Sequence, residues 1–241
     1  MFTLGVDIAL FADYDGTLAL PEKAREERPL PPSLEEALRK LAALMPFAVV
    51  TTKDCQFVMK RVPFASAYAC INGIEIHAAG YVAVAADVKY DAVESLYRKA
   101  TGLNALVEPK RTWRGDIAGF TIDWRDSGIP PPGLEELVRE ASGLGIRVVK
   151  YSRHPFLDFY GSNVDKGNAV RILKALLGVK HVVYMGDSEN DIPAWREADI
   201  KILVRHSLNR GLSIEGVIPI DYEHLPAYLQ EVAKNVTDIK G

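Results

Sequence analysis

Short apolar runs alternate with amphipathic segments along most of the chain. The runs at residues 8–12, 47–51 and 181–185 have the length of buried strands, and residues 34–44 and 166–177 show the apolar spacing of helices. Strands that alternate with helices are typical of a mostly parallel sheet with helices on both faces. The pattern therefore predicts an α/β fold.

Turn and capping residues place the ends of several of these elements. Ser33-Leu-Glu-Glu36 has the form of a capping box and predicts the start of the helix at residues 34–44. Asn72-Gly73, between two apolar runs, predicts a hairpin turn. Gly178 is placed to end the helix at residues 166–177. The other expected elements of the main fold are a helix at 54–61, strands at 68–71 and 200–204, and a helix near 225–232.

The pattern changes between residues 84 and 150. There we expect helices at 91–100 and 134–141 and strands at 104–107, 117–124 and 146–150. These elements suit a small α+β domain inserted into the larger fold. We therefore expect a core of residues 1–83 and 153–241, resuming with a strand at 156–160, and an inserted domain of residues 84–152.

Composition narrows the class of protein. The 241 residues are 48% apolar and 25% charged, as in ordinary globular proteins, and the formal net charge of −3 offers no argument for binding nucleic acid or an anionic membrane. No apolar run approaches the length that spans a membrane. The first apolar residues follow no basic segment and are interrupted by Asp7, so we expect no signal peptide.

The chain has two cysteines, Cys55 and Cys70, and neither lies near another cysteine or a histidine at the spacing of metal ligands. This usage predicts no disulfide framework and a reducing, cytoplasmic setting.

The first candidate for chemistry follows the strand at residues 8–12. Asp13 and Asp15 stand one residue apart before Gly16-Thr17. Alternate residues of an extended segment share a face, so both carboxylates can point at one site, where they repel unless a cation or a proton lies between them. A divalent metal and an attacking carboxylate would satisfy this pattern. A plain surface turn would also use Asp, Gly and Thr.

A second acidic segment, Gly186-Asp187-Ser188-Glu189-Asn190-Asp191, follows another predicted strand. Active sites of open α/β sheets lie at the carboxyl ends of strands, and Mg²⁺ prefers oxygen ligands from one or two carboxylates. We expect Asp13, Asp187 and a backbone carbonyl near Asp15 to hold Mg²⁺, with Asp191 as a further carboxylate of the metal site or a holder of its water. A helix start with an acidic first turn is the alternative.

Two further segments have the groups that a phosphate needs. Lys166 opens a predicted helix, where a positive charge opposes the helix dipole, and this favours a role in binding an anion over an ordinary solvated lysine. Thr51 ends the strand at residues 47–51 and offers a hydroxyl, with Thr52 and Lys53 directly behind it. Helix capping at Thr52 or Asp54 is the other interpretation of this segment.

These four segments resemble, in order and spacing, the four motifs of haloacid dehalogenase (HAD) phosphatases. The resemblance implies a Rossmann-like core with a cap inserted after the third strand, of the type with a small sheet and helices on one side. It implies that Asp13 is the nucleophile, Asp15 the general acid and base, and Thr51, Thr52 and Lys166 the phosphate ligands. Asp13, Asp15, Asp187 and Asp191 would form the metal site.

The predicted insert resembles the cap of trehalose-6-phosphate phosphatases in its Val-Glu-x-Lys strand, which contains Glu108 and Lys110, and in the strand that ends at Arg125. An acidic residue, Asp158, also lies eight positions before Lys166, as in that group. Asp123-Trp124 replaces the group's His-Tyr, however, and Thr51-Thr52-Lys53 is more similar to the Ser-Ser-Lys of mannosyl-3-phosphoglycerate phosphatases. The candidate substrate ligands are Asn72, Glu108, Lys110, Arg125, Asp158 and Asn190.

The expected activity is therefore Mg²⁺-dependent hydrolysis of a sugar phosphate, with trehalose 6-phosphate as the first candidate. Mannosyl-3-phosphoglycerate, phosphoglycolate, a phosphomutase of the same family and a non-catalytic sensor of sugar phosphates stay open as alternatives, as does the oligomeric state. The other polar and aromatic residues of the insert suit either packing and a solvated rim or substrate contact: Arg111, Trp113, Arg114, Trp124 and Arg153.

Overall fold

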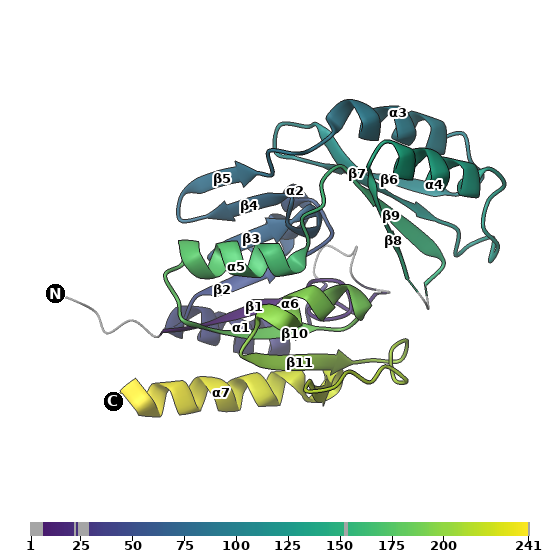
Figure 1. Cartoon of the computed structure of the whole chain (residues 1–241). Coiled ribbons are helices and arrows are strands. Elements are labelled where there is room, and N and C mark those ends of the chain that lie inside the picture. Colours follow the sequence, from purple (N-terminus) through teal and green to yellow (C-terminus); the bar gives the residue numbers. More distant parts are fainter. Residues whose placement is uncertain (1–6, 22, 24–28, 152–153, 241) are drawn as a thin grey trace.

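A computed structural model describes residues 7–21, 23, 29–151 and 154–240, with the side chains of 238–240 left out. It contains one large and one small sheet (Figure 1). The large sheet has, in spatial order, strands β12 (Ile218–Asp221), β11 (Ile200–Arg205), β10 (His181–Gly186), β1 (Ile8–Ala12), β2 (Phe47–Val50), β3 (Ala67–Cys70), β4 (Glu75–Ala78) and β5 (Tyr81–Val84).

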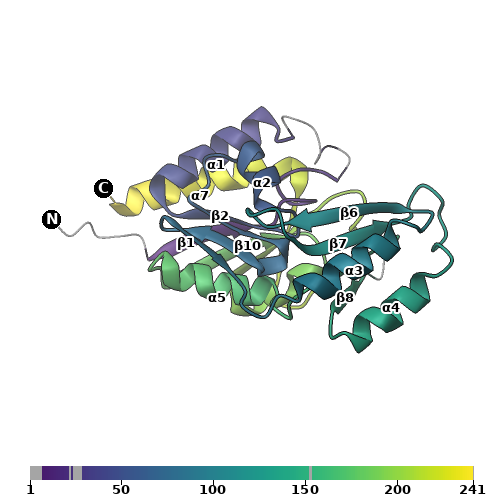
Figure 2. The ribbon, with the colours of Figure 1, turned by 90° about the horizontal axis from the view of Figure 1, so that it is seen from above.

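Parallel pairing joins β12 through β3, and β4 and β5 extend that edge as antiparallel strands. The central strands β1 and β2 are buried on both faces, which explains their continuous apolar sequence. Helices cover both faces (Figure 2). Helices α1 (Pro32–Leu44), α2 (Cys55–Arg61) and α7 (Leu225–Lys240) lie on one face, and α5 (Lys166–Leu176) and α6 (Ile192–Glu197) lie on the other.

The small sheet is antiparallel and carries both of its helices on one face (Figures 1 and 2). Buried apolar residues from both helices and from the sheet form its own core. Its strands are β6 (Leu106–Arg111), β7 (Ile117–Asp123), β9 (Phe156–Tyr160) and β8 (Arg147–Lys150) in spatial order, and its helices are α3 (Tyr90–Ala100) and α4 (Leu134–Gly143).

The α/β fold class and the separate small α+β unit are confirmed. The expectation that the core resumes with the strand at 156–160 is wrong, because β9 pairs with β7 and β8 in the small sheet. An apolar run predicts a strand but not the sheet that the strand joins. The small unit also begins after β5, so an antiparallel hairpin separates it from the third strand. The proposed boundary at 152/153, and Arg153, lie outside the described residues.

Two local expectations also need correction. The first helix begins at Pro32 and Ser33 lies inside it, since a proline at the first helical position needs no amide hydrogen. The strand expected at 104–107 runs instead from Leu106 to Arg111, through Pro109, which the edge position of β6 allows. The hairpin at Asn72-Gly73 is confirmed, since β3 and β4 pair as antiparallel strands across it.

Cys55 and Cys70 form a disulfide, contrary to the expectation from cysteine usage. They are 15 residues apart in the sequence, but the start of α2 and the end of β3 lie side by side in the fold. Within the described part of the chain, no helix is long and apolar enough to cross a membrane.

Candidate active site

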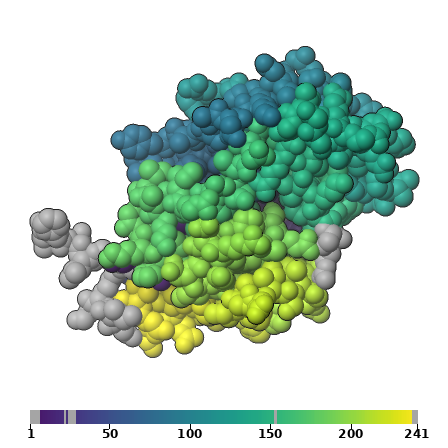
Figure 3. Space-filling model, viewed as in Figure 1, coloured from purple at the N-terminus to yellow at the C-terminus, as the bar shows by residue number. Residues whose placement is uncertain are grey.

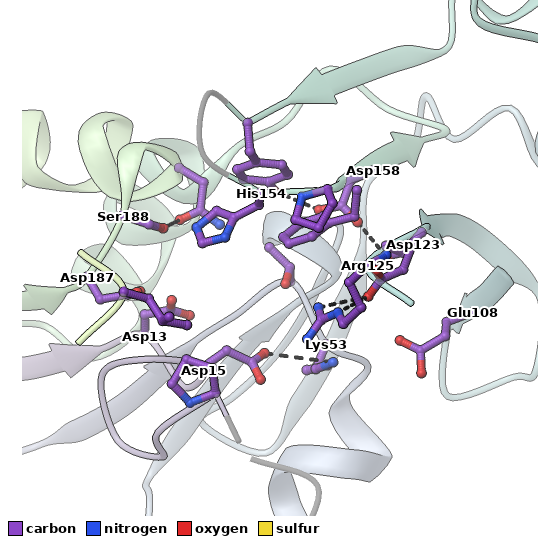
Figure 4. A pocket seen from close by; sticks show the side chains of 18 of the residues that line it. Asp13, Asp15, Lys53, Glu108, Asp123, Arg125, His154, Asp158, Asp187 and Ser188 are labelled. Atoms are coloured by element: carbon purple, nitrogen blue, oxygen red, sulfur yellow. Dashed lines mark hydrogen bonds and ion pairs between the residues drawn. The ribbon is translucent and has the colours of Figure 1, made fainter. Parts of the chain in front are cut away.

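The small domain rests on the large one (Figure 3), against the carboxyl ends of the central strands of the large sheet. A cavity of about 350 Å³ lies between them (Figure 4). The wall formed by the large domain, the core wall, includes Asp13, Asp15 and Asp187. The wall formed by the small domain, the cap wall, includes Glu108 and Asp158. Both acidic segments of the sequence therefore reach the place where open α/β sheets bind their ligands.

Asp13 follows β1 directly and is held beside a buried lysine. The backbone amide of Asp13 donates to the carbonyl of Met185 in β10, which extends the parallel ladder by one residue. Lys166 Nζ lies 3.0 Å from Asp13 Oδ1 and 2.7 Å from Asp191 Oδ1. Asp165 caps helix α5, whose first residue is Lys166, through the amide of Asn168. The position of the lysine is thus fixed by the start of its helix.

Asp187 follows β10 and packs against the turn after Asp13. Gly16 in that turn has φ +80°, and a Cβ added there would lie 2.2 Å from Asp187 Oδ2. Glycine is required for both reasons, since the left-handed backbone disfavours a side chain and the carboxylate already fills its space. The two acidic segments therefore approach as closely as their backbones allow.

His206, which follows β11, supports Asp187 from the other side. The amide of Leu208 donates to His206 Nδ1 at 3.3 Å, so the neutral ring carries its proton on Nε2 and donates to Asp187 Oδ2 at 3.0 Å. Asn209 Nδ2 donates to the Asp187 carbonyl at 2.8 Å. The loop after β11 thus fixes both the backbone and the carboxylate of Asp187.

Asp191 is buried and accepts four hydrogen bonds. Its Oδ1 accepts from the Tyr184 hydroxyl and Lys166 Nζ, and its Oδ2 accepts from the amides of Asp187 and Ser188. With these donors in place, Asp191 orders the loop and the lysine more readily than it contacts a metal directly.

The remaining core residues of the site come from β2 and from the first acidic turn. Lys53 Nζ lies 3.9 Å from Asp15 Oδ2 across the cavity mouth, and Thr52 and Lys53 line the cavity. Thr51 is buried behind them, and its hydroxyl oxygen accepts from the amide of Lys53 at 3.1 Å. That hydroxyl keeps its own hydrogen to donate.

Burial and crowding shift the acids of this site. Burial raises the pKa of Asp13 well above its ordinary value against the opposing charge of Lys166, and nearby carboxylates raise it further. Burial and Asp191 likewise raise the pKa of Asp187. Burial acts to lower the pKa of Lys166, but Asp13 and Asp191 raise it overall. The lysine is therefore cationic, whereas burial and crowding disfavour the charged forms of Asp13 and Asp187 unless a cation lies between them.

The donor set fits a divalent cation. Carboxylate oxygens of Asp13, Asp187 and Asp191 all lie within 4.8 Å of one another. Together with Asp15, these carboxylates pair with two ammonium groups of the described residues, those of Lys53 and Lys166. A hard dication with oxygen ligands, such as Mg²⁺, would balance the charge, with Asp13 and Asp187 as its carboxylates.

On the cap wall, Asp158 is the centre of a buried network. Its Oδ1 accepts from the Thr121 hydroxyl and lies 3.4 Å from Lys110 Nζ, and its Oδ2 accepts from the hydroxyls of Tyr151 and Tyr160. Burial acts to raise the pKa of Asp158, but Lys110 and the three hydroxyls bring it below its ordinary value. Asp158 is therefore a charged, fully hydrogen-bonded carboxylate.

Tyr151 links this network to the core, since its hydroxyl also interacts with Asn190, beside Lys166. A second cap carboxylate, Asp123, binds Arg125, whose Nε donates to Asp123 Oδ2 at 2.8 Å. Glu108 lies near this pair in the cavity wall (Figure 4).

The cavity unites most of the residues expected from the sequence. Its walls include Asp13, Asp15, Thr52, Glu108, Lys110, Arg125, Asp158, Asp187 and Asn190. Thr51, Lys166 and Asp191 are buried directly behind the core wall. Asn72 stays outside the described cavity, with φ 59° in the turn after β3, where its amide donates to the Thr51 carbonyl.

Four of the aromatic and basic residues with two interpretations are described by the structure, and none of the four lines the cavity. Trp113 is 48% exposed, with the guanidinium of Arg114 stacked on it. Trp124 packs against the small domain's core, and the exposed Arg111 donates to a backbone carbonyl.

The sequence analysis missed other wall residues, namely Thr121, Tyr151, His154, Phe156, Ser188 and His206. Of these, Thr121, Phe156 and Ser188 stood within segments already singled out.

Sequence comparison agrees with the expected resemblance. Residues 134–210 match the family model of haloacid dehalogenase-like hydrolases. A glucosyl-3-phosphoglycerate/mannosyl-3-phosphoglycerate phosphatase of Persephonella marina is 29% identical over 114 residues, which are 44% of this chain and 42% of the relative. The match thus spans less than half the length of that relative. A phosphoglycolate phosphatase of Sulfurisphaera tokodaii is 24% identical over 87% of this chain and 86% of its own.

Comparison of structures confirms the fold. A trehalose-6-phosphate phosphatase related protein superimposes with a TM-score of 0.71 at 16% identity, covering 95% of this chain and 99% of the other. The similarity therefore extends over both the large sheet and the small domain.

Proposed function

We propose that this chain, a haloacid dehalogenase-like hydrolase, is a phosphoric monoester hydrolase whose substrate is a sugar phosphate with an uncharged leaving sugar. One observation carries the proposal. A single cavity has the Asp13–Lys166–Asp187 cluster on its core wall and, on its cap wall, a hydrogen-bonding surface whose cations are already paired.

The core wall suits the phosphate end of such a substrate. Lys166 and the hydroxyl of Thr51 stand behind Asp13, and Thr52 and Lys53 lie beside it. Mg²⁺ bound by Asp13, Asp187 and the backbone carbonyl of Asp15 would neutralise phosphate oxygens and hold them in line with the attacking group.

The proposed reaction has two steps. An oxygen of Asp13 attacks phosphorus, the bond from phosphorus to the sugar oxygen breaks, and Asp15 gives its proton to the departing alkoxide. Asp15 then takes a proton from water while the water oxygen attacks phosphorus, which releases phosphate and restores the Asp13 carboxylate. Asp15 lines the cavity, and the charge of Lys166 opposes the rise that burial causes in the pKa of Asp13, which favours the attacking carboxylate form.

The cap wall favours neutral polar groups. Its two described cations are each paired, Lys110 with Asp158 and Arg125 with Asp123, and Glu108 adds a third carboxylate. A second anion on the substrate would enter a wall with excess negative charge, which costs free energy. Sugar hydroxyls would instead donate to the carboxylates and accept from Lys110 and Arg125.

This argument ranks the candidate substrates. Trehalose 6-phosphate has a neutral leaving sugar and comes first. Mannosyl-3-phosphoglycerate and phosphoglycolate each carry a carboxylate in the leaving group. The names of the two sequence relatives favour those esters, so both belong in the test as rivals.

The test is phosphate release from trehalose 6-phosphate, mannose phosphates, mannosyl-3-phosphoglycerate and phosphoglycolate, each with Mg²⁺ and with chelator. We expect Mg²⁺-dependent release with the highest kcat/KM among the neutral sugar esters. Preference for a carboxylate-bearing ester would overturn the charge argument on the cap wall. A product that stays phosphorylated would indicate a mutase, and ligand binding without turnover a sensor.

Asp13→Asn tests the covalent step separately. The variant keeps the shape of the site and removes the nucleophile, so we expect turnover of every substrate in the panel to vanish, together with labelling of the protein by ³²P-substrate in acid-quenched samples. Wild-type turnover in this variant would refute the aspartyl-phosphate route.

A further inference from the structure

A second cluster of metal-ligating side chains lies away from the cavity, on the face of β3 and β4 that α2 covers. Atoms of Cys55, Glu75 and His77 lie within 4.8 Å of one another. Glu75 and His77 are alternate residues of β4 and therefore share a face, and Cys70 is the register partner of Glu75 on β3. Cys55, the first residue of α2, is joined to Cys70 by the disulfide.

The donor atoms already lie close to one another. His77 Nε2 lies 2.7 Å from Glu75 Oε1, and the Glu75 side chain is completely buried. His77 is 18% exposed, which gives an entering ion a path and the ring room to move. Around a tetrahedral Zn²⁺ with bonds of 2.0–2.3 Å, neighbouring donor atoms lie about 3.3–3.7 Å apart. The imidazole and the carboxylate would thus separate by about 1 Å or less, and the sulfur would move inward.

Thiolate, imidazole and carboxylate are together a zinc-type donor set. Zn²⁺ binds all three ligand types, whereas Mg²⁺ avoids sulfur and nitrogen. The chemistry of this cluster therefore differs from that of the all-carboxylate cluster at Asp13 and Asp187. In the structure, the disulfide keeps Cys55 from acting as a thiolate.

We propose that Cys55, Glu75 and His77 form a redox-gated Zn²⁺ site that opens when the Cys55–Cys70 disulfide is reduced. A phosphine reductant breaks the S–S bond, with phosphorus oxidised to the phosphine oxide and water supplying the oxygen and the two thiol protons. Zn²⁺ then replaces the proton of the Cys55 thiol, which leaves to the buffer. Water completes the coordination. The site is independent of the proposed phosphatase activity.

The same glutamate connects this site to the small domain. Glu75 Oε2 accepts from the backbone amide of Trp113, in the turn between β6 and β7, at 2.7 Å. A metal held through Oε1 shares its carboxylate with this contact. Metal binding at Glu75 therefore affects the hydrogen bond through which that turn contacts β4.

Two single variants give a matched test. Cys70→Ser and Cys55→Ser both remove the disulfide and lose similar stability, but only Cys70→Ser leaves the Cys55 thiol free. Each is titrated with Co²⁺ as a spectroscopic probe, in excess Mg²⁺ to fill the carboxylate site, and Zn²⁺ is then added as competitor. Sulfur-to-cobalt charge transfer in the near ultraviolet reports thiolate ligation alone, so metal at the carboxylates does not contribute.

We expect Cys70→Ser to bind one equivalent of Co²⁺ with this absorption, to release it to Zn²⁺, and to bind at least 100-fold more tightly than Cys55→Ser. Wild-type protein should gain the absorption only after phosphine treatment and removal of the phosphine. Adding His77→Ala to Cys70→Ser should weaken binding at least tenfold. Absence of the absorption in Cys70→Ser, or equal binding by the two cysteine variants, would overturn the proposal.

Discussion

Reduction of the Cys55–Cys70 disulfide should lower the stability of the protein substantially. The bond closes a segment with a sequence separation of 15, which runs from the start of α2 to the end of β3. In the unfolded chain this closure removes conformational entropy worth about 3 kcal/mol. For a chain of this length, that loss of unfolding free energy corresponds to a fall in Tm of about 6–12 °C.

The disulfide also holds the turn beside Thr51 and Lys53, at the proposed phosphate site. Near it, the amide of Ile71 donates to the Lys53 carbonyl and the amide of Asn72 to the Thr51 carbonyl. We therefore expect hydrogen exchange at Ile71 and Asn72 to accelerate on reduction more than exchange in the central strand β1. Amides of β1 are protected by its two neighbouring strands and should respond only through global unfolding.

The assay is calorimetry of the oxidised and phosphine-treated protein, with chelator present so that no metal compensates. The double variant Cys55→Ser/Cys70→Ser is the control and should match the reduced protein with or without phosphine. A Tm difference below about 2 °C between oxidised and reduced wild type would refute the entropic reasoning, because the unfolded chain would then gain no appreciable freedom.

Three further outcomes follow from the site. Asp158→Asn should lower Tm at neutral pH, and the Tm difference from wild type should be fully present above a pH of about 3.9 and shrink below it, because the pKa of Asp158 is lower in the folded protein than in the unfolded chain. A Tm difference that stays constant with pH in thermal scans would contradict this. Gly16→Ala should abolish activity, whereas the control Gly80→Ala, which has the same φ of +80° but open space around it, should only lower stability by about 1–2 kcal/mol. Equal kcat values for the two variants would show that Asp187 tolerates the methyl group. Mg²⁺ at 100 times its Kd should stabilise the wild type by about 2.7 kcal/mol in thermal scans, and Asp187→Asn should lose most of this; an unchanged shift would remove Asp187 from the metal site.

The sequence by itself determined the elements that carry the proposed chemistry. Asp13 and Asp187 follow apolar runs that had to be buried strands, and Lys166 begins a helix with its own capping residue. Parallel strands bring their carboxyl ends to one edge, so local signals sufficed to place these side chains at one site. The small domain was also visible, because its helices and strands have regular apolar periods.

Only the tertiary structure decided which strands pair and which distant side chains meet. Strand β9 is apolar in the manner of a core strand but pairs with β7 and β8. His206 reaches Asp187 across 19 residues and Tyr151 reaches Asp158 across 7, and no local pattern marks either residue. Cys55 meets Cys70, Glu75 and His77 because a helix start packs on the face of a hairpin. Periodicity fixes which face of an element is buried, whereas contacts between elements depend on how those faces pack.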